Sequence, residues 1–356
     1  MMKRLLCALM ALVTLCLAPV GLASGNLKER LYLQENIKPL TDEEIPASPL
    51  GVRHYLLISM DKWQNNVDNP GYNDGLVLLT MDEQTGRVIV TSIIRDTWVI
   101  RPDGHPGRIN RIIREYGPQV LLDIINRHFG LNVEKYVIMD WRHIMEIVDA
   151  VGGVEVPLTS SEIHYMKNWA VPVGSTQPEL NGPGTYHLNG FAAVIFMRIR
   201  RTRASNDLDT QDIGRTYRAR LVLSNIADKI SGYDMNQAQK LLTDILKIWE
   251  EPYDKTFTYP DIRNNNIFVA GTMPSGPVKK RAETNITMAD VLDALSVAFA
   301  LRNSQVEQCR LPFDGTYGPY EYANSAGQLM DFEANRALLK DFMFPETFLV
   351  SADPLP

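Results

Sequence analysis

The chain has 356 residues, of which 45% are hydrophobic and 22% charged, and its formal net charge is −6. This composition supports a globular protein with one large or two modest cores. The acidic balance argues against a general nucleic-acid-binding protein, because such domains present a basic surface. Cys309 is the only cysteine beyond residue 24, so we expect no internal disulfide.

The first 24 residues are typical of an export signal. Lys3 and Arg4 precede an apolar run that ends in small residues, which is the pattern of a signal peptide. The run from Leu5 to Ser24 is about 20 residues long, so it could also remain as a membrane anchor with its N-terminus inside. In either case we expect the rest of the chain to be extracytoplasmic. Without residues 1 to 23 it has 34 basic and 42 acidic residues, a net charge of −8.

Three apolar runs follow a polar segment and predict strands. Residues 25 to 52 mix charge and proline and predict a linker. The runs at 55–60, 75–81 and 87–94 are short and bounded by polar or turn-forming residues, as expected of buried strands. The turn residues at 82–86 join the last two runs into a β-hairpin.

The predicted hairpin brings charged residues to one edge of a sheet. If the turn is symmetric about its centre, Asp74 and Arg95 lie opposite each other. If the preceding run is antiparallel to the hairpin, Asp61 ends at the same edge. Each of these residues taken singly is more typical of a turn or a strand end, and a register shift of one residue would separate the side chains. Their convergence therefore predicts a site.

Beyond Arg95 the sequence alternates between helix-like and strand-like segments. A helical period begins at Pro118 and ends before Gly130. A strand, a helix and a strand are then predicted at 133–140, 141–153 and 154–158. Such alternation indicates an α/β sandwich. Amphipathic segments in residues 231 to 356 complete this domain or form a small appendix to it.

Arginine is concentrated between residues 198 and 220, a stretch that carries seven arginines. The end of one predicted helix carries Arg198 and Arg200, and the start of the next carries Arg215 and Arg218 on one face. The planar guanidinium suits bidentate contacts with phosphate oxygens, so we expect an anion, with phosphate first, to bind here. A solvated basic loop is the alternative interpretation.

A series of motifs occurs in a fixed order along the chain: NDGLVLLTMD, IIRDTWV, RIN at 108–110, YGP at 116–118, IVDAVGGVEV, LNGFAAVIFMRIR and DIGRTYRAR. In this order and spacing they resemble the LytR-CpsA-Psr family of cell-envelope proteins. The resemblance covers residues 54 to 230 strongly, and TNITMADVL, CRLPFDGTY and FEANRALLKDFMF extend it almost to the end.

The resemblance implies a three-layer α/β sandwich with a mixed central sheet. Its core would span residues 53 to 235, and residues 236 to 356 would complete the same domain. It further implies a membrane-surface enzyme that binds a glycan carried on polyprenyl (undecaprenyl) pyrophosphate. Such an enzyme moves the glycan, with one phosphate, onto a sugar hydroxyl of peptidoglycan. The glycan could be wall teichoic acid, capsule or another polymer.

The resemblance also assigns roles to individual residues. The corresponding Mg²⁺ ligands are Asp61 and Asp74. The corresponding pyrophosphate contacts are Arg95, Arg198, Arg200 and Arg215, to which the sequence adds Arg218 from the same helix. The predicted catalytic group is Asp74, Arg95 and Asp96, with Asp74 as the candidate base and Asp96 in reserve.

Some positions depart from the family pattern, and other functions stay open. Asn73, Asp74 and Gly75 stand where the family has Ser-Asp-Thr, and Ala219 stands where a glutamine is expected. The segment SNDLDTQ also lengthens the stretch between the two arginine groups. A protein that only binds the lipid-linked glycan, or a hydrolase that cleaves its pyrophosphate with water, is an alternative to the transferase. A DNA-binding regulator is not expected, because only residues 1 to 4 precede the apolar run.

Overall fold

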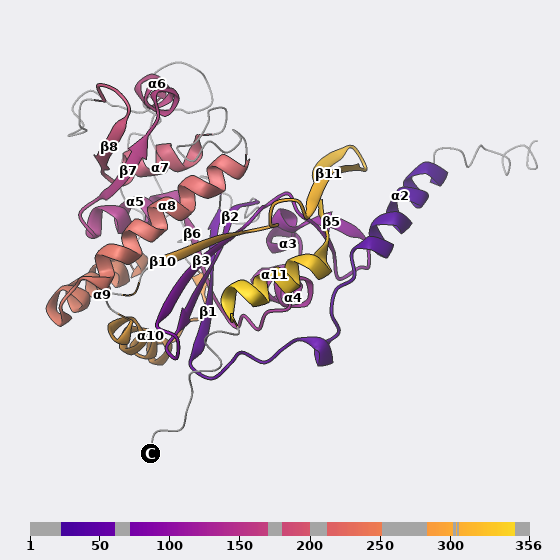
Figure 1. Ribbon diagram of the computed structural model, residues 1–356, viewed down its shortest axis with the longest axis horizontal. Coiled ribbons are helices and arrows are strands. Elements are labelled where there is room, and N and C mark those ends of the chain that lie inside the picture. Colours follow the sequence, from indigo (N-terminus) through magenta and orange to yellow (C-terminus); the bar gives the residue numbers. More distant parts are fainter. Residues whose placement is uncertain are drawn as a thin grey trace, which may run out of the picture.

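The computed structural model describes residues 23–60, 72–169, 180–199, 212–250, 283–301, 304 and 306–345. Its centre is a six-stranded sheet (Figure 1) in the order β10 (Val306–Leu311), β3 (Arg87–Ile93), β2 (Asn73–Asp82), β1 (Val52–Met60), β6 (Lys135–Asp140) and β9 (Glu283–Thr284). The sheet is mixed, because β1 is antiparallel to β2 and parallel to β6, and β10 is parallel to β3. The predicted hairpin is confirmed as β2 and β3, which are antiparallel.

Helices cover both faces of the sheet and form three layers with it (Figure 1). One face packs against α3 (Ile109–Tyr116), α4 (Pro118–Phe129) and α11 (Phe332–Met343), and α2 (Ala23–Asn36) lies to the side and adds Leu33 to the same core (Figure 1). The other face packs against α5 (Trp141–Ala150), α7 (Gly190–Arg198), α8 (Asp212–Ser231) and α10 (Met288–Ala300), and α9 (Met235–Glu250) packs on α5. The predicted three-layer α/β sandwich with a mixed sheet is therefore confirmed.

Shorter elements lie outside these layers. They are the 3-10 turn η2 (Asp42–Glu44), the helix α6 (Ser160–Trp169) and three two-stranded ribbons: β4 (Trp98–Ile100) with β5 (Pro106–Arg108), β7 (Val154–Leu158) with β8 (Gly184–Leu188), and β11 (Tyr317–Tyr322) with β12 (Ser325–Met330). The strand β10 extends the sheet beyond β3, and α11 packs on α4. Part of the C-terminal third of the chain is thus built into the same sandwich.

Burial on both faces explains why the central strands read as apolar runs. In β1, Leu56 and Ile58 point into the core beside α3 and α4, whereas Leu57 packs in the core beside α5 and α7. Successive side chains of a strand point to opposite faces, so a strand covered on both sides needs apolar residues at nearly every position.

The segment predicted as a linker is in part a helix. The chain forms α2 from Ala23 to Asn36, and Leu33 and Ile37 are almost completely buried against the core. The first half of the segment predicted as a linker, 25–52, is therefore largely helical. Only one narrow side of α2 is buried, because Leu27 and Leu31 are each nearly half exposed. A helix that buries so little shows a weak apolar period in the sequence.

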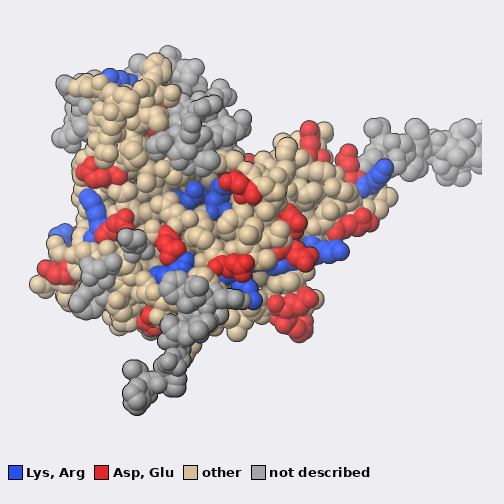
Figure 2. All heavy atoms as spheres, in the orientation of Figure 1, with Lys and Arg blue, Asp and Glu red and all other residues tan. Residues whose placement is uncertain are grey.

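None of the described helices is long and apolar enough to cross a membrane. The predicted signal or anchor lies largely in residues 1 to 22, which are outside the described residues. Over the face shown in Figure 2, acidic and basic atoms are interspersed.

Two buried histidines should make the fold sensitive to acid. Burial lowers the pKa of both His54 and His128 to about 4. The His128 Nε2 accepts a hydrogen bond from the Ile100 N–H at 3.0 Å, and its Nδ1–H donates to the Ile124 carbonyl at 2.8 Å, which requires the neutral ring. Between about pH 6.5 and pH 4 the two histidines are protonated in the unfolded chain but stay neutral in the folded protein. The free energy of unfolding therefore decreases as the pH drops.

We expect each histidine to remove on the order of 3 kcal/mol from the free energy of unfolding by pH 4. Urea unfolding at pH 7 and pH 4.5 measures this loss. His54→Gln should reduce the loss, because its amide can still hydrogen-bond to Thr80 without titrating. His105→Gln, at a half-exposed site, is the matched control and should leave the loss unchanged. Equal losses in all three proteins would contradict the prediction.

Candidate active site

A β-bulge directs Asp74 out of the regular ladder at the end of the sheet. Ser59 pairs with Gly75 and Met60 pairs with Asn73, so Asp74 is an extra residue with no partner on β1. A bulge bends its strand and re-aims the inserted side chain. Asp74 therefore reaches towards residues that a regular strand would not bring to it.

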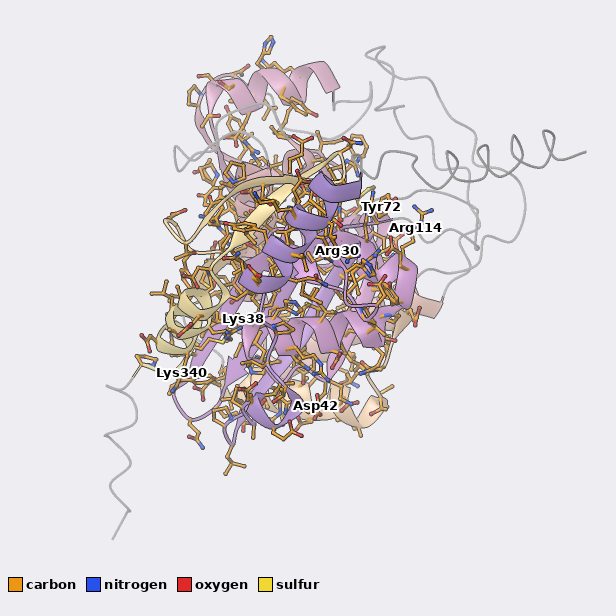
Figure 3. The ribbon with its side chains drawn as sticks, turned by 90° about the vertical axis from the view of Figure 1, so that its right-hand side faces the viewer. Arg30, Lys38, Asp42, Tyr72, Arg114 and Lys340 are labelled. Carbon is orange, nitrogen blue, oxygen red and sulfur yellow. The ribbon has the colours of Figure 1, made fainter. Side chains whose placement is uncertain are left out.

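The start of β2 is held from the other face of the sheet. The ring of Tyr72 lies beneath two guanidiniums of α3, with centroid distances of 4.9 Å to Arg114 and 5.9 Å to Arg111. Figure 3 shows Tyr72 and Arg114 side by side at this position. Such cation–π contacts help to fix the strand end next to the bulge.

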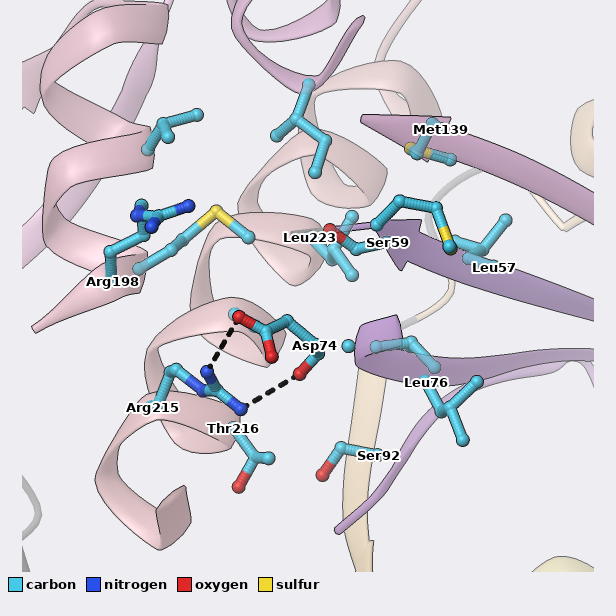
Figure 4. A pocket seen from close by; sticks show the side chains of 17 residues that line it. Leu57, Ser59, Asp74, Leu76, Ser92, Met139, Arg198, Arg215, Thr216 and Leu223 are labelled. Atoms are coloured by element: carbon cyan, nitrogen blue, oxygen red, sulfur yellow. Dashed lines mark hydrogen bonds and ion pairs between the residues drawn. The ribbon is translucent and has the colours of Figure 1, made fainter. Parts of the chain in front are cut away.

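Two arginines converge on the Asp74 carboxylate. The Arg95 Nη1 pairs with Oδ1, as the symmetric hairpin predicted. The Arg215 Nη1 lies 3.2 Å from Oδ2, and its Nη2 donates to the Asp74 backbone carbonyl at 3.0 Å. The three side chains are only 10% to 19% exposed, so they interact where water screens them weakly. Figure 4 shows the contacts of Asp74 with Arg215.

Charges of alternating sign continue from this pair. The Arg95 Nε lies 3.5 Å from the Asp96 Oδ2, and the Arg108 Nη1 donates to the Asp96 Oδ1 at 3.0 Å. Arg108 belongs to the RIN motif at 108–110, and no role was predicted for this residue. The sequence shows only that Arg108 follows the loop after Asp96. The pairing of β4 with β5 brings Arg108 back to the Asp96 carboxylate.

An apolar pocket begins behind these charged groups, between the sheet and the helices α5, α7 and α8. Its walls are mainly aliphatic, with residues that include Leu57, Val77, Met139, Ile144, Val194 and Leu223. Its polar side chains are Ser59, Asp74, Ser92, Arg198, Arg215 and Thr216 (Figure 4). The space that can hold a water-sized molecule is narrow, ≈ 90 Å³. The pocket thus joins a charged end to an apolar interior.

The helix α7 carries Arg198 to this pocket. Asn189 caps its first turn by accepting a hydrogen bond from the Ala192 N–H at 3.0 Å. A Cβ on Gly190 would clash with the Met145 carbonyl, so glycine lets α7 pack directly on α5. Arg198, the last residue of α7, then lines the pocket.

The structure places Arg218 away from the pocket, so the prediction that it contacts phosphate is corrected. Its side chain is completely buried, and its Nε donates to the Glu162 Oε1 at 2.7 Å. Its Nη1 donates to the Ile199 carbonyl at 2.8 Å. Arg215 and Arg218 are neighbours on one turn of α8, as their spacing predicted. Arg218, however, pairs with the buried carboxylate of Glu162 on α6. Arg218 therefore ties α8 to α6.

Two further predicted residues, Asp61 and Arg200, lie outside the described residues. Ala219 is half-buried and lines the pocket one helical turn after Arg215. Of the remaining predicted site residues, Asp74, Arg198 and Arg215 line the pocket. Arg95 joins them through its ion pair with Asp74, and Asp96 through Arg95.

A family model described as the LytR_cpsA_psr family matches residues 48–256, which is more than half of the chain. The chain belongs to this family. Biofilm regulatory protein A of Streptococcus mutans is 25% identical over 197 residues, 52% of this chain and 44% of that protein. Polyisoprenyl-teichoic acid–peptidoglycan teichoic acid transferase TagU of Bacillus cereus is 26% identical over 214 residues, 58% of this chain and 62% of that protein. The chain thus spans between 44% and 62% of the length of these two relatives.

A solved structure described as TagT bound to LI-WTA has the same fold. It superposes with a TM-score of 0.57 at 16% sequence identity, covering 85% of this chain and 96% of that chain. The LytR_cpsA_psr fold therefore extends beyond the part of the chain that the family model matches.

The charge of this LytR_cpsA_psr site suits a phosphate ligand. Four arginines (95, 108, 198 and 215) and two aspartates (74 and 96) give the described residues a net charge of +2. No group of three or more potential metal ligands occurs in the part of the chain that the structure describes. Asp74 nevertheless has the donor type that Mg²⁺ prefers, a hard carboxylate oxygen. The chemistry of this residue fits Mg²⁺ held jointly with a phosphate.

Proposed function

We propose that the protein transfers a glycopolymer from a polyprenyl pyrophosphate carrier to a hydroxyl of peptidoglycan. The observation that carries the proposal is that an apolar pocket joins a charged end, whose described residues have a net charge of +2. A lipid pyrophosphate has the complementary form, because a diester of pyrophosphate carries about two negative charges next to an apolar chain.

The relatives support the same reaction class. The TagU protein of Bacillus cereus is named as a teichoic acid transferase acting between a polyisoprenyl carrier and peptidoglycan. The TagT structure is described with LI-WTA bound. For the present chain, the proposed donor and acceptor are supported by these similarities and by the residues of the site. We propose on the same grounds that the protein acts at the outer face of the cytoplasmic membrane.

In the proposed complex the lipid occupies the apolar pocket. The space now open is smaller than most ligand pockets, which measure roughly 300 to 1,000 Å³. The walls include Met60, Met139 and Met197. Methionine side chains are unbranched and adapt their shape at low cost, so we expect these walls to move apart when a prenyl chain enters.

Arg95, Arg198 and Arg215 bind the pyrophosphate, and Asp74 keeps the first and last of these guanidiniums aimed at the mouth of the pocket. The acceptor hydroxyl attacks the phosphorus that carries the glycan. A new P–O bond forms, the bond from this phosphorus to the bridging oxygen breaks, and polyprenyl phosphate leaves. Arginines held in place before reaction stabilise the charge that develops on the bridging oxygen.

A carboxylate near the reacting phosphorus accepts the proton of the hydroxyl. We assign this role to Asp74, with Asp96 as the second candidate, because both carboxylates belong to the same chain of ion pairs. Asp74, together with Asp61, would also hold Mg²⁺, which when bound neutralises phosphate charge. The transfer itself conserves charge and needs no oxidant or reductant.

The test is to incubate the purified protein with lipid-linked glycan, Mg²⁺ and peptidoglycan. Transfer predicts equal amounts of polyprenyl phosphate released and glycan phosphodiester formed on peptidoglycan. Glycan phosphate released into solution would instead indicate a hydrolase. Tight binding with neither product would indicate a protein that only holds the donor. Either of these results would contradict the proposal.

Ala219 offers a gain-of-function test of the same site. We expect Ala219→Gln to tighten binding of the lipid pyrophosphate about tenfold, because a hydrogen bond to a charged group contributes roughly 1.5 to 3 kcal/mol. Ala219→Leu adds similar volume without a donor and is the matched control. Titration of each variant with a short-chain prenyl pyrophosphate measures the change. If glutamine and leucine weaken binding equally, position 219 contacts the lipid chain rather than the pyrophosphate.

A further inference from the structure

Arg220 is a buried guanidinium that faces no carboxylate among the described residues. Only 6% of the residue is exposed, and its Nη1 donates a hydrogen bond to the Ser92 hydroxyl. Its Nε is buried without a hydrogen-bond partner. Burial, with the neighbouring Arg310 acting in the same direction, lowers the pKa of Arg220 to about 10. Because buried charges are normally paired, this arrangement destabilises the fold unless an anion joins it.

Arg310 lies beside it and is only partly compensated. Arg310 on β10 is the Cα partner of Ser92 on β3. The residue is 8% exposed, and its Nη2 pairs with Asp314, whose side chain is 80% exposed. Its guanidinium carbon lies 5.3 Å from the centroid of the Tyr317 ring. Of the two buried cations only Arg310 has a carboxylate partner, and that carboxylate is almost entirely in solvent, so these three described residues have a net charge of +1.

These cations lie next to residues that line the pocket. Leu57, Val77, Ser92 and Arg310 form one row of Cα partners across β1, β2, β3 and β10. The first three of them line the pocket. On α8, Ala219 lines the pocket and Arg220 follows it directly. The row thus runs from the apolar side of the pocket, next to α5 and α7, to Ser92 and Arg310. Arg220 joins it through its hydrogen bond to Ser92.

We infer that Arg220, Arg310 and Ser92 form a second anion subsite, which binds a phosphate group of the polymer carried by the donor. The inference rests on the proposed function and specifies its substrate as a polymer with phosphate in its chain. The lipid takes the apolar side, so the sugar–phosphate part leaves on the side of the arginines. A tetrahedral phosphate can accept hydrogen bonds from donors that arrive from three elements, α8, β3 and β10. Asp314, which lies in solvent, is free to move aside.

Two soluble donors separate this subsite from the pyrophosphate site. Both are short-chain prenyl pyrophosphoryl glycans, and only one has a phosphodiester in its glycan. We expect the phosphodiester to tighten binding by the wild-type protein about tenfold or more, as a charge-assisted contact does. Arg220→Met and Arg310→Met should each abolish this gain while the affinity for the phosphate-free donor stays the same. Arg53→Met, which removes an exposed ion pair with Asp293, is the control and should keep the gain.

The proposed subsite is wrong if the wild-type protein does not bind the phosphodiester donor more tightly than the phosphate-free donor. It is also wrong if both arginine variants still do so. Failure of the wild-type protein to bind the phosphate-free donor would instead contradict the proposed function. A peptidoglycan stem peptide offers carboxylates as the other source of an anion. If Arg220→Met weakens binding of this peptide and not of the phosphodiester donor, the assignment to polymer phosphate is wrong.

The stability of Arg220→Met gives a second readout that needs no lipid. If Arg220 serves to bind a ligand and does not stabilise the fold, replacing it should not lower the stability of the protein. The melting temperature of this variant should therefore equal or exceed that of the wild-type protein. Inorganic phosphate should raise the melting temperature of Arg215→Met, which keeps the subsite, and should raise that of an Arg215→Met, Arg220→Met double variant less. A large drop in melting temperature in Arg220→Met, with equal responses to phosphate, would show a purely structural role.

Discussion

Replacing Asp74 by asparagine should abolish glycan transfer while the protein remains folded. The substitution removes the carboxylate that orients Arg95 and Arg215 and that we assign as the proton acceptor. Losing a general base costs about 10² to 10⁴ in rate, and the misdirected arginines add to this. The transfer assay with lipid-linked glycan and peptidoglycan should therefore show a loss of at least about 10³-fold.

The fold should tolerate this change, because asparagine is nearly isosteric with aspartate and the site is partly exposed. Asp293→Asn, which removes a carboxylate from the exposed pair with Arg53, is the matched control and should retain full transfer activity. Circular dichroism and the melting temperature distinguish lost chemistry from lost structure. Transfer by Asp74→Asn at more than about a tenth of the wild-type rate would exclude Asp74 as the base and leave Asp96 as the candidate.

The largest effect on stability should come from the buried pair of Arg218 and Glu162. Arg218→Met leaves the Glu162 carboxylate in a fully buried position without its cation. Breaking such a pair from one side costs about 3 to 5 kcal/mol. Glu162 also accepts hydrogen bonds from the Thr159 N–H at 2.8 Å and the Thr159 hydroxyl at 2.9 Å, so it cannot turn away without uncapping α6.

A double variant separates the buried charge from the packing. Glu162→Gln combined with Arg218→Met removes both charges and keeps an amide at the start of α6. We expect it to recover most of the stability that Arg218→Met loses. Urea unfolding of the two single variants and the double variant completes the cycle. If the losses of the single variants simply add, the pair does not hold α8 to α6.

The position of Asp74 could be predicted from the sequence more readily than its orientation. The hairpin turn is nearly symmetric, and the observed register, which ends at Leu76 and Ile93, would place Asp74 opposite Arg95 if it were extended by two residues. The bulge that re-aims Asp74 leaves no mark in the apolar pattern, because it lies at the last pair of the β1 ladder. The pattern of the sequence therefore predicted that Asp74 and Arg95 lie close together, but not the direction in which the Asp74 side chain points.

Long-range partners explain the remaining differences. Arg215 and Arg218 look alike in the sequence, yet Glu162, which is 56 residues away, takes Arg218 into the interior. Arg108 reaches Asp96 only because β4 and β5 pair. The row that leads to Arg220 depends on β10, whose residues lie more than 200 positions after their partners on β3. Spacing along the chain does not encode such contacts.

The most direct test of the account is a crystal structure of the protein with a short-chain prenyl pyrophosphate and Mg²⁺. We predict that the prenyl chain lies between the sheet and the helices α5, α7 and α8, with Met139 and Met197 moved apart. The pyrophosphate should then lie within hydrogen-bonding distance of Arg95, Arg198 and Arg215. A prenyl chain bound outside this pocket, or a pyrophosphate that contacts none of these arginines, would contradict the account.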